Sequence, residues 1–239
     1  MIRLILVAVF LVLFLVLGIP LLLIEWVIGK FNQRAKDISS LRIVQWAFKV
    51  ILFLAGTKVV IKGEENVPKN EPVLYVGNHR SYFDIVITYS RVPDLTGYIA
   101  KKEMLRWPLL VNWMKNLHCL FLDRQDVKQG LKTILTAIDK VKAGISICIF
   151  PEGTRSKMGN EMLEFKGGSF KAATKAKCPI VPVALIDSFK PFDTNSIAPV
   201  TVQVHFLKPL YYDDYKDMKT NDIAELVRSQ IQKTIHDSI

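Results

Sequence analysis

Residues 73–84, VLYVGNHRSYFD, pass from an apolar run into a polar turn, and the fold of the chain follows from this stretch. Val73–Val76 is rich in β-branched residues, which is typical of a buried strand. The polar segment Asn78–Asp84 comes next, and a helix is expected over Ile85–Ser90. A strand that turns directly into a helix is the repeating unit of α/β proteins. The stretch therefore predicts polar side chains at the end of a buried strand.

Apolar strands and amphipathic helices alternate along the rest of the chain. The expected strands are Val59–Lys62, Ile145–Phe150, Ile180–Leu185 and Thr201–Phe206. A helix that ends at Gly144 is expected to bury Leu131, Ile134, Leu135, Ile138 and Val141, and a last helix, from Asp222 to about His236, is expected to bury Leu226, Val227 and Ile231. This alternation predicts an α/β domain over residues 58–239, with a largely parallel central sheet flanked by helices.

The N-terminal segment, residues 1–57, has a different composition. Residues 4–24 carry no charge, and as one helix they would extend about 32 Å, close to the roughly 30 Å of a bilayer's hydrocarbon core. Gly18 and Pro20 lie inside this run, so a bent helix held in one leaflet competes with a full span. A cleaved signal peptide is disfavoured because the run passes directly into Glu25, Trp26 and Lys30. The segment is expected to be a helical membrane anchor.

Basic residues gather beside this segment. The formal net charge is +10, and residues 1–62 hold eight Lys and Arg against two acidic residues. This balance favours an anionic membrane surface, whereas nucleic acid is disfavoured as a partner because no groove-reading motif accompanies the charge. A second apolar stretch, Ile43–Ala55, is joined to the first by the polar link Asn32–Arg42. It is too short to span and is expected either to lie at the interface or to pack on the domain.

The cysteines indicate the redox compartment. Cys119, Cys148 and Cys178 are widely spaced and lie in apolar or Pro-flanked surroundings. They suggest neither a disulfide framework nor a metal site, which agrees with a reducing, cytoplasmic compartment.

His79 and Asp84 are the first candidate pair for chemistry. Within one helix, residues five positions apart would point about 140° away from each other, so contact requires His79 in the turn before the helix. With Ser81 as the N-cap, Asp84 falls at N3, where the helix N-terminus favours a carboxylate. An aspartate that holds one imidazole nitrogen leaves the other free to take a proton from an alcohol. The pattern alone also fits a capped helix with a solvent-exposed histidine.

Two turns that carry arginine form the second candidate group. The turn Phe150-Pro151-Glu152-Gly153-Thr154-Arg155-Ser156 follows an expected strand, and Phe121-Leu122-Asp123-Arg124 ends another. Arginine makes bidentate contacts with phosphate oxygens, and glycine allows the backbone to approach a ligand closely. As the alternative for the first turn, Glu152 and Arg155 pair with each other on the surface. As the alternative for the second, Arg124 forms a structural ion pair.

In this order and spacing, four blocks closely resemble the glycerolipid acyltransferase family, specifically its lysophosphatidate (1-acylglycerol-3-phosphate) acyltransferase branch. The blocks are His79–Asp84 with Asn78 and Ser81, Phe121–Arg124, Phe150–Ser156 and Ile180–Leu185. The resemblance covers about residues 59–210, and the first and third blocks together are its most specific part.

The resemblance implies a role for each matched residue. His79 is the general base and Asp84 its orienting partner, while the acceptor phosphate is bound by Arg124, Glu152, Gly153, Thr154 and Arg155, with Lys101 as a further contact. Asn78, Ser81, Phe150, Pro151 and Pro182 support the motifs, and Val181–Val183 lies beside the acyl-donor pocket. No metal and no cofactor is implied, and acyl-CoA or acyl-carrier protein is the co-substrate.

The implied reaction is direct attack of the 2-hydroxyl of 1-acylglycerol-3-phosphate on a thioester, which gives phosphatidate for phospholipid biosynthesis. The sequence lacks a Gly-x-Ser-x-Gly nucleophile elbow, since residues 167–171, GGSFK, fail at the last position. The other three histidines, His118, His205 and His236, lack a nearby aspartate in the required turn.

Other functions remain open at this point. They are an acyltransferase for glycerol-3-phosphate or another lysolipid, a thioesterase, and a catalytically idle membrane-binding module. The expected partners are the bilayer, a lysophospholipid acceptor and the thioester donor, with the catalytic domain at the cytoplasmic face of the membrane.

Overall fold

A computed structural model of the protein describes residues 2–193 and 198–239. Its strands are β1 (Thr57–Lys62), β2 (Leu74–Gly77), β3 (Thr96–Lys101), β4 (Leu120–Leu122), β5 (Ser146–Ile149), β6 (Ile180–Ile186) and β7 (Val200–Phe206). Its α-helices are α1 (Ile2–Leu17), α2 (Ile19–Phe31), α3 (Gln33–Leu54), α4 (Phe83–Tyr89), α5 (Leu110–Asn116), α6 (Val127–Lys142), α7 (Lys171–Ala176), α8 (Lys190–Asp193), α9 (Tyr212–Tyr215) and α10 (Thr220–His236). Short 3-10 helices are η1 (Glu64–Asn66), η2 (Lys102–Arg106) and η3 (Gly167–Phe170).

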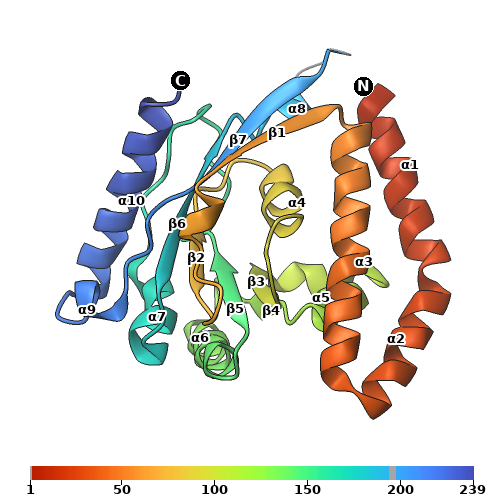
Figure 1. Ribbon diagram of the computed structural model, residues 1–239, viewed down its shortest axis with the longest axis horizontal. Helices are drawn as coiled ribbons and strands as arrows, with labels where there is room; N and C mark the ends of the chain where they lie inside the picture. The colour runs from red at the N-terminus through yellow and green to blue at the C-terminus, as the bar shows by residue number, and fades with distance from the viewer. Residues whose placement is uncertain (1, 194–197) are drawn as a thin grey trace.

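The strands form one twisted sheet between two layers of helices (Figure 1). Their order is β1-β7-β6-β2-β5-β3-β4. Neighbouring strands run parallel except for β6 and β7, which are antiparallel. The prediction of a largely parallel sheet flanked by helices is confirmed.

The two faces of the sheet carry separate hydrophobic cores because successive strand residues point to opposite sides. In β2, Tyr75 belongs to a core that includes residues of α3, α4 and α5. Its neighbours Leu74 and Val76 belong to the other core, with residues of α6, α7 and α10. Every residue of β2, β5 and β6 is buried, as expected for strands covered on both faces.

Most of the predicted elements are confirmed, with small shifts at their ends, but one helix buries a different stripe. The expected inward residues of α6 included Leu131 and Leu135, which are 54% and 52% exposed. Ile138 and Val141 are buried as expected, and Ala137 is buried beside them. Because α6 packs on β4 and β5 at one edge of the sheet, its buried stripe is narrower than the apolar spacing suggests.

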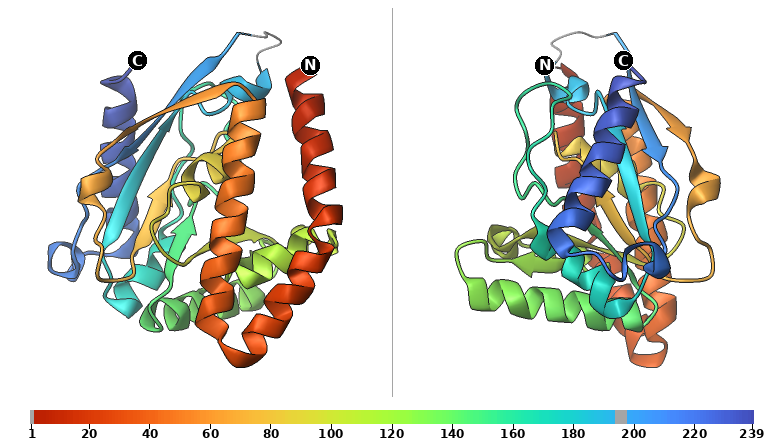
Figure 2. Two further views of the ribbon diagram at one scale, coloured as in Figure 1. Left: turned by 45° about the vertical axis from the view of Figure 1, so that its right-hand side comes forward. Right: turned by 90° about the vertical axis from the view of Figure 1, so that its left-hand side faces the viewer.

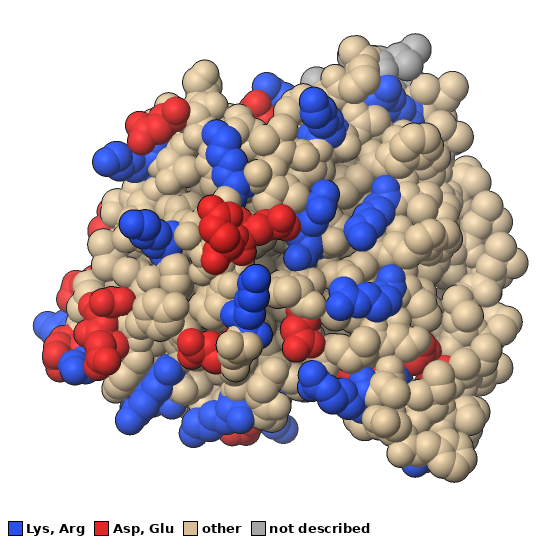
Figure 3. Space-filling view, in the orientation of Figure 1, with Lys and Arg blue, Asp and Glu red and all other residues tan. Residues whose placement is uncertain are grey.

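The first two helices form a bent pair. The angle between α1 and α2 is 48°, and the break falls at Gly18, so the predicted kink is confirmed. No single helix in the described chain is long and apolar enough to cross a bilayer, although the bent pair together meets that test by length and composition. Its outer residues include exposed apolar side chains such as Ile5, Val12 and Leu23. Figure 3 shows that the side of the molecule formed by these helices is almost free of charged residues.

The third helix belongs to the core of the domain. Residues 33–42, expected as part of a polar link, are already helical, and the Asn32 side chain caps α3 by accepting a hydrogen bond from the Ala35 amide at 3.0 Å. Leu41, Val44 and Ile51 are buried in the same core as Tyr75. The second apolar stretch therefore packs on the domain.

Trp113 of α5 joins the bent pair to the rest of the protein. Its indole is 2% exposed, and its ring centroid lies 5.5 Å from that of Phe14 in α1. A Cβ atom on Gly18 would lie 3.6 Å from the indole, so the break between α1 and α2 rests directly on this side chain. At the other end of α1, Arg3 donates hydrogen bonds to the carbonyls of Ala55, at 3.2 Å, and Ala198, at 3.0 Å.

Candidate active site

Four neighbouring parallel strands end at the same edge of the sheet and bring the predicted site residues there. His79 follows β2, Glu152 follows β5, Lys101 ends β3 and Arg124 follows β4. Neighbouring strands lie about 4.8 Å apart, so the turn after β5 is next to His79, whereas Arg124 is roughly 14 Å along the edge. The parallel topology therefore explains why residues distant in sequence share one side of the molecule.

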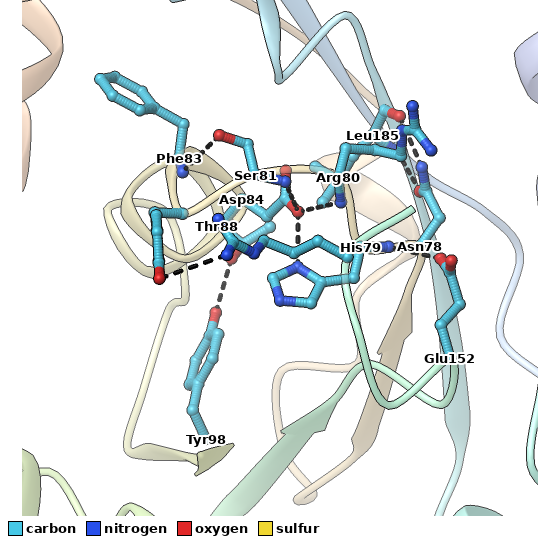
Figure 4. Close-up of polar contacts among 12 residues, drawn as sticks. Asn78, His79, Arg80, Ser81, Phe83, Asp84, Thr88, Tyr98, Glu152 and Leu185 are labelled. Atoms are coloured by element: carbon cyan, nitrogen blue, oxygen red, sulfur yellow. Dashed lines mark hydrogen bonds and ion pairs between the residues drawn. The ribbon is translucent and has the colours of Figure 1, made fainter. Parts of the chain in front are cut away.

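The His79–Asp84 pair has the geometry that the spacing required. His79 lies in the turn before α4, and its Nδ1 is 2.7 Å from Asp84 Oδ2 (Figure 4). The same carboxylate oxygen accepts the amides of Arg80 at 2.6 Å and Ser81 at 2.8 Å. Because α4 begins at Phe83, Asp84 is its second residue, not its third, and Ser81 Oγ accepts the Phe83 amide at 3.2 Å.

The imidazole is oriented so that one nitrogen remains open. The side chain of Asp84 is fully buried, whereas that of His79 is 15% exposed. Since Asp84 holds Nδ1–H, the other nitrogen, Nε2, carries the lone pair, and no hydrogen bond among the described residues occupies it. A neutral histidine with a free, accessible Nε2 is able to accept a proton from a substrate hydroxyl.

Phe150 fixes the plane of the imidazole from one side. Its ring stacks on that of His79, with centroids 4.5 Å apart and an angle of 17° between the planes. A Cβ atom on Gly77, at the end of β2, would lie 3.1 Å from this phenyl ring, so glycine leaves the space that the stack needs. The stacked phenyl ring therefore restricts rotation of the imidazole.

A buried chain of hydroxyl groups supports the backbone of Asp84. Thr88 donates to the Asp84 carbonyl at 2.6 Å, and the Tyr98 hydroxyl donates to Thr88 Oγ1 at 2.9 Å. Burial raises the pKa of Tyr98 well above its ordinary value, so its hydroxyl stays protonated and remains a donor. This chain anchors the first turn of α4 to β3 in the sheet.

Asn78 connects the end of β2 to β6. It is completely buried, donates to the Leu185 carbonyl at 2.8 Å and accepts the Leu185 amide at 2.8 Å. The side chain therefore makes the pair of hydrogen bonds that a neighbouring strand would make. Pro182 lies in β6 opposite Val76, buried within the sheet.

The buried carboxylate of Glu152 supports the backbone of His79. It is 4% exposed, and its two oxygens accept the amides of His79 at 2.6 Å and Leu163 at 3.0 Å. Burial raises its pKa, while these two hydrogen bonds act in the opposite direction. The expected contact of Glu152 with phosphate does not fit this geometry, because both oxygens are engaged and an ionised carboxylate repels an anion.

The rest of the turn after β5 presents Arg155 to solvent. Gly153 has a φ of +71°, a conformation that favours glycine, and Thr154 is exposed. The Arg155 guanidinium lies 3.9 Å from the centroid of the Tyr82 ring and donates to its hydroxyl at 3.3 Å. The alternative ion pair between Glu152 and Arg155 is not formed, so the cation remains available beside the His79 turn.

The segment after this turn is held by contacts that the sequence did not indicate. Arg80 donates to the Glu161 carbonyl at 2.6 Å, and the Ser156 amide donates to the His79 carbonyl at 2.9 Å. The Asn160 side chain exchanges two hydrogen bonds with Asp187, at 3.1 and 3.0 Å. Pro151 is buried, and its carbonyl accepts the Lys166 amide at 3.2 Å. These bonds fix the segment over the turn that carries Arg155.

Lys101 and Arg124 lie at the same edge of the sheet as His79 but outside the group formed by the His79, Asp84 and Arg155 side chains. Both are exposed, and no hydrogen bond or ion pair joins either of them to His79, Asp84 or Arg155 in the described chain. The neighbouring ion pair is between Lys102 and Asp123, at 2.8 Å. A ligand bound at His79 can therefore reach Lys101 or Arg124 only if it extends along the edge of the sheet.

A second histidine–aspartate pair lies elsewhere in the molecule. His118 Nε2 is 2.9 Å from Asp37 Oδ2 of α3, and its Nδ1 is 3.0 Å from Lys140 Nζ of α6. No aspartate lies near His118 in a turn like that of His79, and its partner comes instead from a helix 81 positions earlier. This pair joins α3 to the amino end of β4, at the opposite end of the strands from His79.

The stability of the protein should depend on pH through His118. Burial, followed by Lys140, lowers the pKa of His118 below 6.5, so the unfolded chain binds the proton first as the pH falls. The free energy of unfolding should then decrease below about pH 6.5, and His118→Asn should remove this contribution. Urea unfolding at pH 7.5 and 5.0 measures the difference, and an equal pH dependence in both proteins would contradict it. Asparagine is suitable because it tolerates the positive φ of position 118.

The site as a whole has the groups of a base-catalysed transferase. No three His, Cys, Asp or Glu side chains gather in a way that would hold a metal ion in residues 2–193 and 198–239. The site combines an imidazole held by a buried aspartate with an exposed arginine. The fold places all three on one rigid edge.

Comparison with known proteins identifies the family. The sequence profile of the Acyltransferase family matches residues 58–186. A 1-acyl-sn-glycerol-3-phosphate acyltransferase of Borreliella burgdorferi is 30% identical over 189 residues, 78% of this chain and 75% of that protein. One of Cocos nucifera is 31% identical over 184 residues, 76% of this chain, and the match spans 59% of the coconut protein. The chain belongs to the acyltransferase family.

A solved structure agrees with the fold. The crystal structure of a 1-acyl-sn-glycerophosphate (LPA) acyltransferase from Thermotoga maritima superposes with a TM-score of 0.80, covering 98% of this chain and 96% of that chain. Its sequence is 22% identical to this one, so the likeness extends to the fold.

Proposed function

We propose that this protein transfers a fatty acyl group from a thioester to the 2-hydroxyl of 1-acylglycerol-3-phosphate and so makes phosphatidate. The observation that carries the proposal is the His79 imidazole, held at Nδ1 by buried Asp84 and open at Nε2. Arg155 packs on Tyr82 in the same turn. The names of the Borreliella and coconut relatives support the choice of acceptor.

The proposed step is a direct acyl transfer. His79 Nε2 takes the proton of the acceptor hydroxyl as its oxygen attacks the thioester carbonyl. The new ester C–O bond forms, the C–S bond breaks, and the proton passes from the imidazolium to the departing sulfur, which leaves as a thiol. Asp84 stabilises the imidazolium between these events. The proposed donors are acyl-CoA and acyl-carrier protein, and the step needs neither a metal nor a cofactor.

Arg155 is proposed to bind the acceptor phosphate. Arg155→Ala should raise the KM for lysophosphatidate by about 10- to 150-fold, the equivalent of roughly 1.5–3 kcal/mol for a hydrogen bond to a charged group. The turnover of an acceptor without a phosphate should be unchanged. Lys157→Ala is the matched control, because Lys157 is an exposed cation in the same segment. An unaltered KM in Arg155→Ala would refute this role.

An acceptor panel tests the function itself. The purified protein is offered lysophosphatidate, glycerol-3-phosphate, lysophosphatidylcholine and lysophosphatidylethanolamine, each with acyl-CoA and with acyl-carrier protein, and the products are separated by mass. Phosphatidate should be the main product. A preference for another acceptor would reassign the substrate, and free fatty acid released equally with and without acceptor would indicate a thioesterase.

We also propose that α1 and α2 bind the bilayer, with the catalytic domain at the cytoplasmic face. Support comes from the exposed apolar side chains of both helices and from the Lys30–Trp26 contact, with the ammonium 5.0 Å from the ring centroid. Aromatic residues beside cations are typical of the membrane–water interface. Cys119, Cys148 and Cys178 are free thiols, as expected in a reducing compartment. Protease protection in sealed vesicles of known orientation tests the proposed topology.

A further inference from the structure

We propose that a cleft between α2 and α5 binds an anionic phospholipid of the bilayer, separately from the acceptor that reacts at His79. The cleft has a volume of about 520 Å³ and is lined by residues of α2, α3 and α5 and by Leu109. Figure 2, left, shows α5 beside α2 in the lower part of the molecule. Because α5 leads into the amino end of β4, the cleft lies toward the opposite edge of the sheet from His79.

One wall of the cleft is apolar. It consists of Ile19, Leu22, Leu23 and Trp26, which recur along one side of α2 at helical spacing. Ile19, Leu23 and Trp26 are 42%, 62% and 61% exposed, so this wall opens toward the outer apolar surface of the bent pair. An acyl chain lying along α2 would cover it.

The facing wall is polar. Asn112, Lys115 and Asn116 lie on one side of α5, and Lys36 of α3 contributes a second ammonium group to the same cleft. An apolar wall opposite a polar wall matches an amphiphile, since the chain of a lipid contacts one and its headgroup the other. The two asparagine amides can donate hydrogen bonds to phosphate or glycerol oxygens.

The two lysines give the cleft a preference for an anion. Neither Lys36 nor Lys115 forms an ion pair with a carboxylate among the described residues. The nearby carboxylate of Asp37 is 5% exposed and is already engaged, with Gln33 at 2.6 Å and His118 at 2.9 Å. A phosphodiester bound in the cleft would be attracted by both ammonium groups.

The backbone at the rim of the cleft is strained. Leu109 has a φ of 62° and a ψ of −51°, a region that residues other than glycine rarely adopt. Such strain is concentrated where a ligand or function requires it. The turn at Leu109 starts α5, and thereby orients the polar side of that helix toward α2.

A lipid fits the cleft better than a soluble anion does. Inorganic phosphate would contact the lysines but would leave the α2 wall exposed to water, whereas a phospholipid covers both walls. Trp26, at the end of the apolar wall, carries the Lys30 ammonium over its ring and marks the level of lipid headgroups. The occupant we assign is therefore a bilayer phospholipid with a net negative headgroup.

Photocrosslinking in nanodiscs tests the assignment. The full chain is placed in phosphatidylcholine discs with increasing fractions of a phosphatidylglycerol that carries a diazirine in its acyl chain, and crosslinked peptides are mapped by mass spectrometry. Crosslinks should concentrate in residues 19–26 and 109–116. The apparent affinity should fall about fivefold in Lys36→Gln and roughly 25-fold in Lys36→Gln/Lys115→Gln, from about 1 kcal/mol per cation.

Matched controls separate this site from general charge and from catalysis. Lys171→Gln/Lys175→Gln removes the same charge from exposed positions of α7 and should leave the crosslinks unchanged. His79→Ala should also retain them, and Lys36→Gln/Lys115→Gln should keep full acyl transfer to substrate dispersed in neutral detergent. If the double variant unfolds, Lys115→Glu, at an exposed position, replaces it.

Four results would overturn the proposal. Crosslinks spread evenly over α1 and α2 would indicate non-specific contact with lipid. Equal labelling by a phosphatidylcholine probe would remove the anionic preference. Displacement of the probe by inorganic phosphate, but not by chloride of equal ionic strength, would indicate a simple anion site. Loss of acyl transfer in step with loss of crosslinking would assign the lysines to the reaction.

Discussion

Replacing His79 by alanine should lower kcat by about two to four orders of magnitude, because a positioned general base usually contributes that much. The loss should appear in kcat more than in KM, since the imidazole acts on the proton in the transition state and Arg155 still binds the acceptor. Initial rates of thiol release with lysophosphatidate and acyl-CoA measure it. The fold should survive, because the imidazole is partly exposed and its main contacts are with Asp84 and Phe150.

A matched variant makes the His79 result interpretable. His118→Asn removes the other aspartate-paired histidine, at the far end of the strands, and should transfer acyl groups at the normal rate at pH 7.5. Near-normal turnover by His79→Ala would end the proposed mechanism. A comparable loss in His118→Asn would show that the effect does not depend on the base.

Asp84→Asn should have the second largest effect, a loss of about two to four orders of magnitude in kcat. An amide in place of the carboxylate no longer stabilises the imidazolium and favours the wrong tautomer of His79. The variant should also unfold more easily, by about 1–3 kcal/mol. The reason is that Oδ2 of Asp84 accepts three hydrogen bonds, which an amide group can no longer all receive if its nitrogen takes that place. An amide nitrogen at the place of Oδ1 would be buried with no acceptor, because Oδ1 has no hydrogen-bond partner in the described chain.

A second variant distinguishes a role in orientation from a role in folding. Thr88→Val is the structural control, since it removes the hydroxyl chain below Asp84 without touching the carboxylate. Asp84→Asn with a normal kcat would exclude the aspartate from the mechanism.

The elements that the sequence predicts best are the strands with a continuous apolar run. Strands β2, β5 and β6 are buried on both faces, and their continuous apolar runs are visible without a structure. Strand β3 escaped because its sequence, TGYIAK, has neither a long apolar run nor strict alternation. The buried stripe of α6 is narrower than predicted because the periodicity of the sequence does not show where the supporting sheet ends.

The same contrast holds for the site. The spacing of His79 and Asp84 required a turn before a helix, and the structure has it. The stack of Phe150 on His79 joins residues 71 positions apart and depends on two strands being neighbours, which no local pattern encodes. Glu152 was expected at the phosphate because the family resemblance implied it, but the fold turns its carboxylate toward two backbone amides. Side-chain contacts between neighbouring strands that are distant in sequence therefore cannot be predicted from local sequence patterns.

The burial of Trp113 limits how a form of this protein that is soluble without detergent can be engineered. Its indole is 2% exposed because Phe14 and the break in the bent pair cover it. A truncation that removes residues 1–32 would uncover this large aromatic surface and promote aggregation. Ile5 and Val12, by contrast, already point outward and are 61% and 60% exposed. Substitution of such outward positions by polar residues, with the inner side of the bent pair α1–α2 retained, should give a soluble form of the protein.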